Sequence, residues 1–155
     1  MLGMAGISAT AFTGRSHNYA LNPEFDPGKT GIKITGLKTY ILPRAIIVKL
    51  ETNAGISGWG ESSPNNTHLI RTFIETDIKK RVIGIDPFDV EPLWDELFWY
   101  NHDLGPAGAL PYAIAGIDLA MWDLKGKIFQ QPVYKLLGGS YQKEFLTYGG
   151  FGIYE

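Results

Sequence analysis

The sequence predicts an α+β fold in which a three-stranded antiparallel meander is followed by a bundle of helices. Residues 32–62 show the two-residue alternation and the glycine-containing turns of strands. Residues 68–128 place apolar side chains at the 3.6-residue spacing of helices. An order of strands first and helices second is typical of α+β domains, in which helices cover one face of an antiparallel sheet.

Each predicted strand has a recognisable boundary. The first begins with the alternation of residues 32–35, slips in phase at Gly36 as expected for a β-bulge, and stops at Pro43. The second covers residues 45–52 and the third covers residues 56–62, and a short glycine-containing turn joins them.

The third strand carries two glycines on one face. Gly58 and Gly60 alternate with Ser57, Trp59 and Glu61. A glycine inside a strand often marks the close approach of another backbone. We therefore expect a neighbouring element to pack tightly against this face.

Three helices are predicted after the sheet. The first covers residues 68–83 and stops at Gly84, the second begins after Asp89 as its N-cap, and the third covers residues 111–128. The apolar stripe of the second helix comprises Val90, Leu93, Trp94, Leu97 and Phe98.

The third helix has two apolar stripes. Its large stripe comprises Ile114, Ile117, Met121, Leu124 and Ile128. Its small stripe, formed by Ala113, Gly116 and Ala120, lets another backbone pack closely. Asp123 and Lys127 are spaced i,i+4 with the acid first, which is the favourable orientation for a helical ion pair. We expect the small stripe and this pair to fix the helix against its own sheet.

The chain continues past this helix. Residues 133–137 predict a short helical turn closed by Gly138, and residues 145–148 predict a new strand that has no partner before Glu155. This pattern is typical of a chain cut just inside a second domain. The predicted domain organisation is residues 1–31, residues 32–140 and residues 141–155.

The N-terminal residues allow two interpretations. Residues 1–14 are small, apolar and uncharged, and Ala9 and Ala11 form an A-x-A-like cleavage pattern. Residues 1–16 are either the remnant of a signal peptide without its basic start, which implies a periplasmic or exported protein, or an N-terminal arm of a cytoplasmic one. Residues 17–31 are a linker on either interpretation.

The composition excludes several classes of function. The 155-residue chain has 14 Lys+Arg against 16 Asp+Glu and a net charge of -2, so it lacks the basic surface that nucleic acids require. No apolar run reaches the roughly 18 residues of a membrane span. Without cysteine, disulfides and thiolate sites are excluded. Trp94, Trp99 and Trp122 are expected in the core rather than stacked on a ligand.

The third helix and the segment after it carry a specific motif. Residues 113–127 read AIAGIDLAMWDLKGK, and residues 132–139 read PVYKLLGG. This motif resembles the signature of the mandelate racemase/muconate lactonizing enzyme family, within the enolase superfamily, although Met121 stands where the family more often has Leu or Ala. The sequence GWGE at residues 58–61 is similar to the N-terminal domain of the same family, and the resemblance covers residues 32–155.

The resemblance implies a two-domain enzyme whose N-terminal α+β domain caps a modified (β/α) barrel. Family members remove the proton α to a carboxylate and stabilise the resulting enediolate with Mg²⁺. The metal ligands and acid/base groups lie at the ends of barrel strands, so we expect no catalytic or metal residue in this chain and no activity from it alone. A small-molecule carboxylate and the protein's own barrel are the implied partners, and a homo-oligomer stays open.

The same resemblance implies that two N-terminal loops close over the barrel mouth and contact the distal part of the substrate. By position, these are the turn at residues 42–45 and the loop at residues 61–68. The candidate substrate-capping residues are Arg44, Ser62, Asn65, Asn66 and His68. The alternatives are a solvated Arg44 and a helix-capping role for Asn66 or Thr67.

Two functions stay open at this point. The polar second loop favours the capping, substrate-specificity domain of a Mg²⁺-dependent sugar-acid dehydratase, with a racemase or a cycloisomerase as further options. The alternative is a free-standing, non-catalytic α+β binding module that lost its barrel. A continuation past Glu155 with a Lys-x-Lys strand and acidic strand ends would support the first function.

Overall fold

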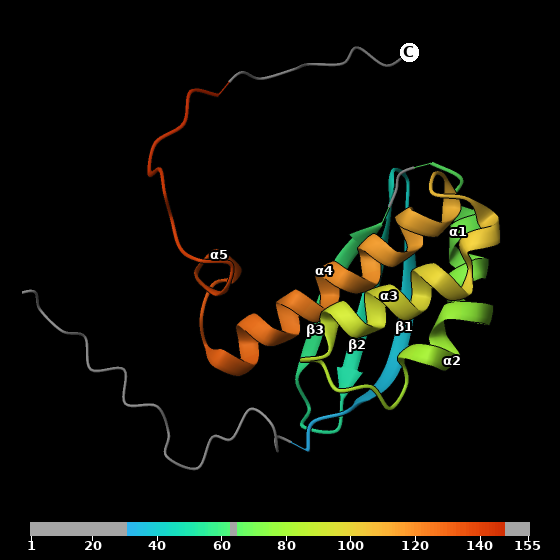
Figure 1. Ribbon diagram of the computed structural model, residues 1–155, viewed down its shortest axis with the longest axis horizontal. Helices are drawn as coiled ribbons and strands as arrows, with labels where there is room; N and C mark the ends of the chain where they lie inside the picture. Colours follow the sequence, from blue (N-terminus) through green and yellow to red (C-terminus); the bar gives the residue numbers. More distant parts are fainter. Residues whose placement is uncertain (1–30, 63–64, 148–155) are drawn as a thin grey trace, which may run out of the picture. The chain divides into compact units, whose positions relative to one another are not determined.

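The computed structural model describes residues 31–62 and 65–147, and it confirms the α+β class. Strands β1 (Ile34–Leu42), β2 (Ala45–Thr52) and β3 (Ser57–Ser62) form an antiparallel sheet in the order β1-β2-β3 (Figure 1). The register shifts between Ile34 and Gly36, which confirms the predicted β-bulge. The turn before β3 requires a glycine, because Gly55 has a φ of 74°.

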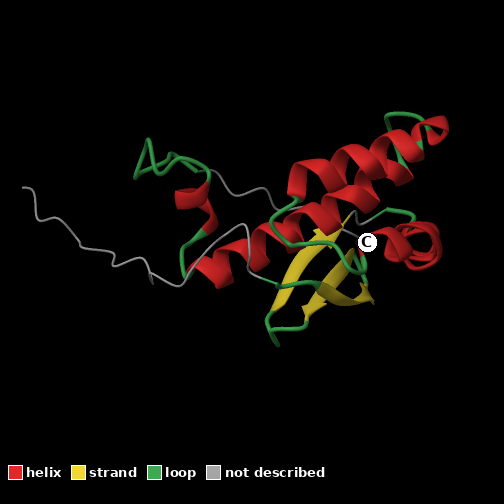
Figure 2. Ribbon diagram, turned by 60° about the horizontal axis from the view of Figure 1, so that its bottom comes forward, coloured by secondary structure: helices red, strands yellow, loops and turns green. Residues whose placement is uncertain are grey.

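The helices follow in the predicted order and lie on one side of the sheet (Figure 2). They are α1 (Thr67–Phe73), the π-helical turn η1 (Ile74–Ile78), α2 (Lys79–Val82), α3 (Val90–Tyr100), the 3₁₀ turn η2 (His102–Leu104), α4 (Ala109–Phe129) and α5 (Val133–Leu136). Elements α1, η1 and α2 run without a break, so the predicted helix over residues 68–83 is confirmed, with a π turn inside it. No helix in the described part of the chain is long and apolar enough to cross a membrane.

The core lies between the sheet and the helices. Along β2, Ile46, Val48 and Leu50 are fully buried. The helices contribute Ile70, Ile74, Ile78, Val82, Val90, Leu93, Leu97, Leu110, Ile114, Ile117, Met121 and Leu124. Burial of these apolar side chains is the main stabilising contribution to the domain. The predicted large stripe of α4 is therefore confirmed, with Ile128 partly buried at its end.

β3 and α4 approach until their backbones touch. A Cβ on Gly58 would overlap the carbonyl oxygen of Ala120, and a Cβ on Gly60 would overlap the carbonyl oxygen of Gly116. A Cβ on Gly116 would lie 2.9 Å from Val48 Cγ2 and 3.1 Å from Ser62 Cβ, so a larger side chain there would overlap both residues. The close approach predicted for the strand glycines and for the small stripe is confirmed, and both predictions describe one contact.

The tryptophans of α3 lie outside the core, so the sequence prediction for them is wrong. Trp94 is 39% exposed and Trp99 is 65% exposed. The reason is that α3 packs chiefly on α4, and its apolar sector is wider than this contact. Trp94 instead stacks on Phe98, with ring centroids 5.0 Å apart. Trp122 of α4 is partly buried against the core.

The C-terminal segment differs from the expectation as well. Residues 145–147 form no strand, and Tyr148 lies outside the described residues. A strand needs a neighbour that takes its backbone hydrogen bonds, and none of the three described strands pairs with this segment. The two interpretations of residues 1–16 also concern a part of the chain outside the described residues.

Candidate functional site

The two predicted loops lie at the same end of the sheet. β1 runs toward the turn at residues 43–44, β2 runs back from it, and β3 runs toward it again, so Ile41, Ile46 and Ser62 align across the sheet. Figure 1 shows the β1–β2 turn and the end of β3 at one end of the strands. The topology of the sheet therefore brings the first loop to the same end as residues 65–68.

Four of the five candidate residues present exposed side chains at this end. They are Arg44, Asn65, Asn66 and His68. Asn66 has a φ of 52°, a left-handed conformation that Asn tolerates better than most residues. It occupies the N-cap position of α1, but its side chain makes no capping hydrogen bond. The capping alternative is therefore wrong for the Asn66 side chain.

Ser62 has a different environment from the other candidates. It is only 6% exposed, because it shares the inward face of β3 with Gly58 and Gly60. Its Oγ donates a hydrogen bond of 2.6 Å to the carbonyl oxygen of Tyr112, in the first turns of α4. This bond ties the end of β3, where the second loop begins, to α4.

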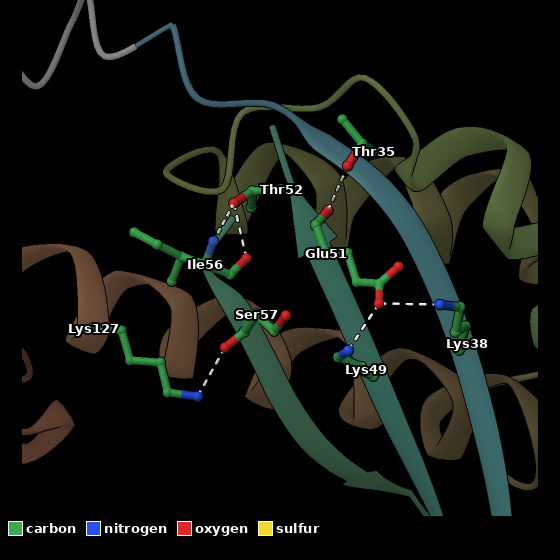
Figure 3. A network of polar contacts seen from close by, with 8 residues as sticks. All are labelled: Thr35, Lys38, Lys49, Glu51, Thr52, Ile56, Ser57 and Lys127. Carbon is green, nitrogen blue, oxygen red and sulfur yellow. Dashed lines mark hydrogen bonds and ion pairs between the residues drawn. The ribbon is translucent and has the colours of Figure 1, made fainter. Parts of the chain in front are cut away.

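The ion pair predicted on α4 closes the edge of β3. Lys127 Nζ lies 2.6 Å from Asp123 Oδ2. Asp123 also accepts a hydrogen bond of 2.8 Å from the backbone N–H of Trp59. Lys127 donates one of 2.8 Å to the carbonyl oxygen of Ser57 (Figure 3). β3 is an edge strand, and its unpaired backbone groups would otherwise be open to another strand. We call Asp123 and Lys127 the β3 clamp.

The outer face of the sheet, which points away from the helices, carries its own charge network. Glu51 Oε1 lies 2.8 Å from Lys49 Nζ and 3.1 Å from Lys38 Nζ (Figure 3). The hydrogen bond from Lys49, followed by that from Lys38, holds the pKa of Glu51 below its usual value, and the bond to Glu51 raises the pKa of Lys49. Lys49 Nζ also lies 5.4 Å from the centre of the Trp59 ring, which is 5.9 Å from the ring of Tyr40.

Asp118 on α4 is a partly buried carboxylate beside an apolar cleft between α3 and α4. The cleft is lined by Val90, Leu93, Trp94, Leu97, Ile114, Ile117 and Met121. Burial raises the pKa of Asp118, and the negative charge of Glu91 raises it further. Among the residues that the structure describes, none forms a hydrogen bond or an ion pair with this carboxylate.

Lys125 lies on the same side of α4 as Asp118. Burial lowers the pKa of Lys125, although the nearby acidic side chains oppose this effect. Its ammonium group lies 4.6 Å from the centre of the Trp122 ring, a cation–π distance. The sequence pattern of α4 did not single out Asp118 and Lys125, because their neighbours come from α3 and from the loop before it.

The described residues do not fit a magnesium site. Within residues 31–62 and 65–147, no three His, Asp or Glu side chains lie close enough together to hold a metal ion. Glu51 and Asp123 are engaged with lysines instead. A magnesium ion needs carboxylate oxygens that converge on one point, and this part of the chain provides no such arrangement.

Comparison with known proteins gives relatives for most of the chain. Residues 28–138 match the sequence profile of the mandelate racemase/muconate lactonizing enzyme N-terminal domain. The D-galactonate dehydratase of Variovorax paradoxus is 40% identical over 122 residues, which are 78% of this chain and 32% of that protein. The D-galactonate dehydratase of Ralstonia pickettii is 38% identical with the same coverage. The chain thus spans about a third of the length of these relatives.

Solved structures match over the same region. A mandelate racemase/muconate lactonizing protein from Paracoccus denitrificans, complexed with magnesium, has a TM-score of 0.68 and 32% identity, covering 72% of this chain and 31% of that one. A member of the enolase superfamily from Salmonella Typhimurium has a TM-score of 0.65 and 32% identity, covering 72% of this chain and 30% of that one.

Proposed function

This chain belongs to the mandelate racemase/muconate lactonizing enzyme family, and we propose that it is the capping, substrate-specificity domain of a sugar-acid dehydratase. The observation that carries the proposal is the convergence of two polar loops at one end of the sheet. It is supported by relatives near 40% identity that are D-galactonate dehydratases. In such an enzyme the rest of the protein would abstract the proton α to the carboxylate.

The role of this domain is to close over the substrate and to recognise its distal hydroxyl groups. Arg44, on the first loop, carries five N–H donors, and the amides of Asn65 and Asn66 both donate and accept hydrogen bonds. The imidazole of His68 adds a fourth polar group on the second loop. A polyol chain offers many hydroxyl partners to such groups, whereas an aromatic substrate would leave them unpaired.

The hydroxyl of Ser62 has a separate role in this proposal. It is buried and already donates to the carbonyl oxygen of Tyr112. Ser62 therefore holds the base of the second loop, the β3 clamp holds the strand that leads to it, and the exposed residues meet the substrate. A loop held at its base closes in one geometry, which positions its contacts and excludes water from the reacting atoms.

Magnesium and the proton-transferring groups belong to the remaining part of such an enzyme. In this family the metal stabilises the negative charge of the enediolate. Because the described residues here do not fit a metal site, no chemical step is assigned to them. The 155 residues alone are expected to be inactive.

A chimera tests the proposal. Residues 31–147 replace the matching N-terminal third of the Variovorax paradoxus dehydratase, and elimination of water from D-galactonate is measured with Mg²⁺ present. We expect an active chimera in which Arg44→Ala, Asn65→Ala and His68→Ala each lower kcat/KM by about 3–10-fold, the cost of one lost hydrogen bond. Asp95→Ala, an exposed change on α3 outside both loops, is the matched control and should leave kcat/KM unchanged.

Two results would contradict the proposal. An active chimera in which none of the three loop variants changes kcat/KM would exclude the loops from substrate recognition. Tight binding of D-galactonate to the isolated 155-residue chain would instead favour the free-standing binding module. Isothermal titration calorimetry with galactonate distinguishes these cases.

A further inference from the structure

The π-helical turn η1 presents Glu75 to strand β1. Four buried side chains recur every four residues along α1, η1 and α2, namely Ile70, Ile74, Ile78 and Val82. In a regular α-helix of 3.6 residues per turn, each four-residue step would rotate the next side chain by about 40° around the helix. A π turn, with its i→i+5 hydrogen bonds, contains more residues per turn and takes up part of this rotation. Ile74 and Ile78 therefore both reach the core, and Glu75 between them reaches β1.

Glu75 is joined to β1 through Thr39. Thr39 is only 9% exposed, and its Oγ1 donates a hydrogen bond of 2.7 Å to Glu75 Oε1. The backbone N–H of Thr39 also donates to this carboxylate, and Lys79 Nζ lies 3.3 Å from Glu75 Oε2. Burial raises the pKa of Glu75, but these hydrogen bonds outweigh burial and hold the pKa below its usual value. The acceptor is therefore an ionised carboxylate at neutral pH.

This contact has the same parts as the β3 clamp at the opposite edge of the sheet. In both, an acid is followed four residues later by its lysine partner on a helical segment. In both, the acid accepts a hydrogen bond from an edge strand, β1 or β3. We call Thr39, Glu75 and Lys79 the β1 clamp. Hydrogen bonds to an ionised acceptor are stronger than those between neutral groups, so each clamp fixes its strand to a helix.

The β1 clamp lies between the supports of the two polar loops. Thr39 is three residues before Leu42, where β1 ends at the first loop, which is about 10 Å along a strand. Glu75 is eight residues after Thr67, where α1 begins at the second loop, which is about 12 Å along a helix. A single contact therefore joins the strand that leads into the first loop to the helix that leads out of the second.

We propose that Glu75 and Thr39 are positioning residues that fix the spacing between the two loops, so that both loops contact one substrate at the same time. The inference rests on the proposed function, because the spacing matters only for a substrate that spans both loops. A substrate gains the contacts of the second loop at a smaller entropic cost when that loop is already held at the right distance from the first. Loss of the β1 clamp should therefore weaken substrate binding more than it slows the chemical step.

The spacing is measured first in the 155-residue chain, which has no cysteine and can carry two defined spin labels. The labels are attached at Arg44→Cys on the first loop and at His68→Cys on the second, and both positions are exposed. Dipolar EPR then gives the distribution of distances between the labels. We expect Glu75→Ala to broaden this distribution, and Thr39→Val, which keeps the side-chain shape but removes the hydroxyl, to do the same. An unchanged distribution in both variants would overturn the inference.

The matched control is Asp77→Ala in the same π turn. The partners of Asp77 are Thr76 and Lys80, which lie on the same helical segment. Asp77→Ala therefore removes a carboxylate and its lysine pair without changing the contact to β1, and the label distances should stay as they are in the unsubstituted chain. Broadening by Asp77→Ala as large as that by Glu75→Ala would indicate a general loosening of the helix and would overturn the inference.

Kinetics of the chimera described above test the consequence for the substrate. We expect Glu75→Ala and Thr39→Val each to raise KM for D-galactonate by about 3–10-fold, the equivalent of one lost hydrogen bond, and to change kcat little. The double variant should have the same KM as Glu75→Ala, because the two residues share one contact. A merely structural defect would instead lower the amount of active enzyme, and thus the apparent kcat, at an unchanged KM.

The outcomes separate this inference from the proposed function. Broadened label distances together with a folded chimera that does not dehydrate galactonate support the β1 clamp as the determinant of loop spacing and remove the proposed substrate. An active chimera whose KM is unchanged by both Glu75→Ala and Thr39→Val overturns the inference and keeps the function. If the chimera does not fold, the label distances in the 155-residue chain decide.

Discussion

The outer face of the sheet and the outer face of α4, formed by Tyr112, Ala115, Leu119 and Trp122, are exposed to a similar degree but differ in their polar neighbours. Tyr40 and Trp59 on the sheet are 43% and 44% exposed, and Tyr112 and Leu119 on α4 are 43% and 49% exposed. On the sheet, Lys38 and Lys49 pair with Glu51, and Lys49 Nζ lies 5.4 Å from the centre of the Trp59 ring. On α4, the neighbouring Asp118 has no hydrogen bond or ion pair among the described residues, and the positive charge of Lys125 acts on it only from a distance. The two faces therefore expose apolar groups to the same degree and differ in how firmly their charges are paired.

The largest effect on stability is expected from a substitution on the inner side of α4, where the helix packs on β3. Gly116→Leu should destabilise the domain by about 1–3 kcal/mol or more, because the new side chain overpacks against Val48 and Ser62. The control is Ala115→Leu, one residue away on the outer face, which should change stability by only about 0.5 kcal/mol or less. Chemical denaturation of both variants measures this difference, and unchanged stability of Gly116→Leu would contradict the close packing.

The β3 clamp should have the next largest effect. Asp123→Ala removes the acceptor of the Trp59 backbone N–H and the partner of Lys127, and we expect a loss of about 1–2 kcal/mol. Asp123→Asn keeps an oxygen that can accept the Trp59 hydrogen bond, so its loss should be smaller. Hydrogen exchange of the Trp59 amide reports the bond directly, and equal exchange in the wild type and in Asp123→Ala would show that the clamp does not hold the strand.

Asp118→Asn tests the polar side of the outer face of α4. Because the pKa of Asp118 is raised in the folded chain, its charged form disfavours folding at neutral pH, and this penalty disappears as pH falls and the carboxyl is protonated in both states. The isolated Asn variant should therefore melt at a higher temperature than the wild type at pH 7, and the difference should vanish in acid. Thermal melts of both proteins across pH measure this difference.

The smallest effect is expected on the outer face of the sheet. The pKa of Glu51 is lowered by its lysine partners, so its contribution to stability is present above the usual Glu pKa and is lost as pH falls through the lowered value. Glu51→Gln should lower the melting temperature slightly at neutral pH, and the difference should shrink in acid and in high salt, which screens exposed pairs. A difference that persists in high salt would indicate that this face is covered in solution.

Short-range patterns predicted the elements of this fold well. The two-residue alternation of residues 32–35 and its slip at Gly36 predicted β1 with its bulge. The glycines of one segment and the small residues of another predicted the two sides of the β3–α4 contact. The family resemblance carried by the α4 motif is also confirmed. Each of these predictions came from a pattern within a single short segment, even where, as for β3 and α4, the two segments lie far apart in the sequence.

Features that depend on distant neighbours were predicted less well. The sequence indicated the Asp123–Lys127 pair but not its bonds to the β3 backbone, which join residues 64 and 70 positions apart. Trp94 and Trp99 were expected in the core, because an apolar stripe does not show how much of it a partner helix covers. Of the candidate loop residues, Ser62 is buried because the inward face of β3 continues to its last residue. The pattern of alternating glycines could have indicated this position.

The contact between β3 and α4 also governs when the chain can fold as it is synthesised. β3 leaves the ribosome long before α4 does, and the groups that close its edge lie on the last turns of that helix. Until Lys127 emerges, the nascent sheet has an open edge and a bare glycine surface, a state in which chains are vulnerable to misassembly. Translation past α4 is therefore the point at which this domain can first become protease-resistant.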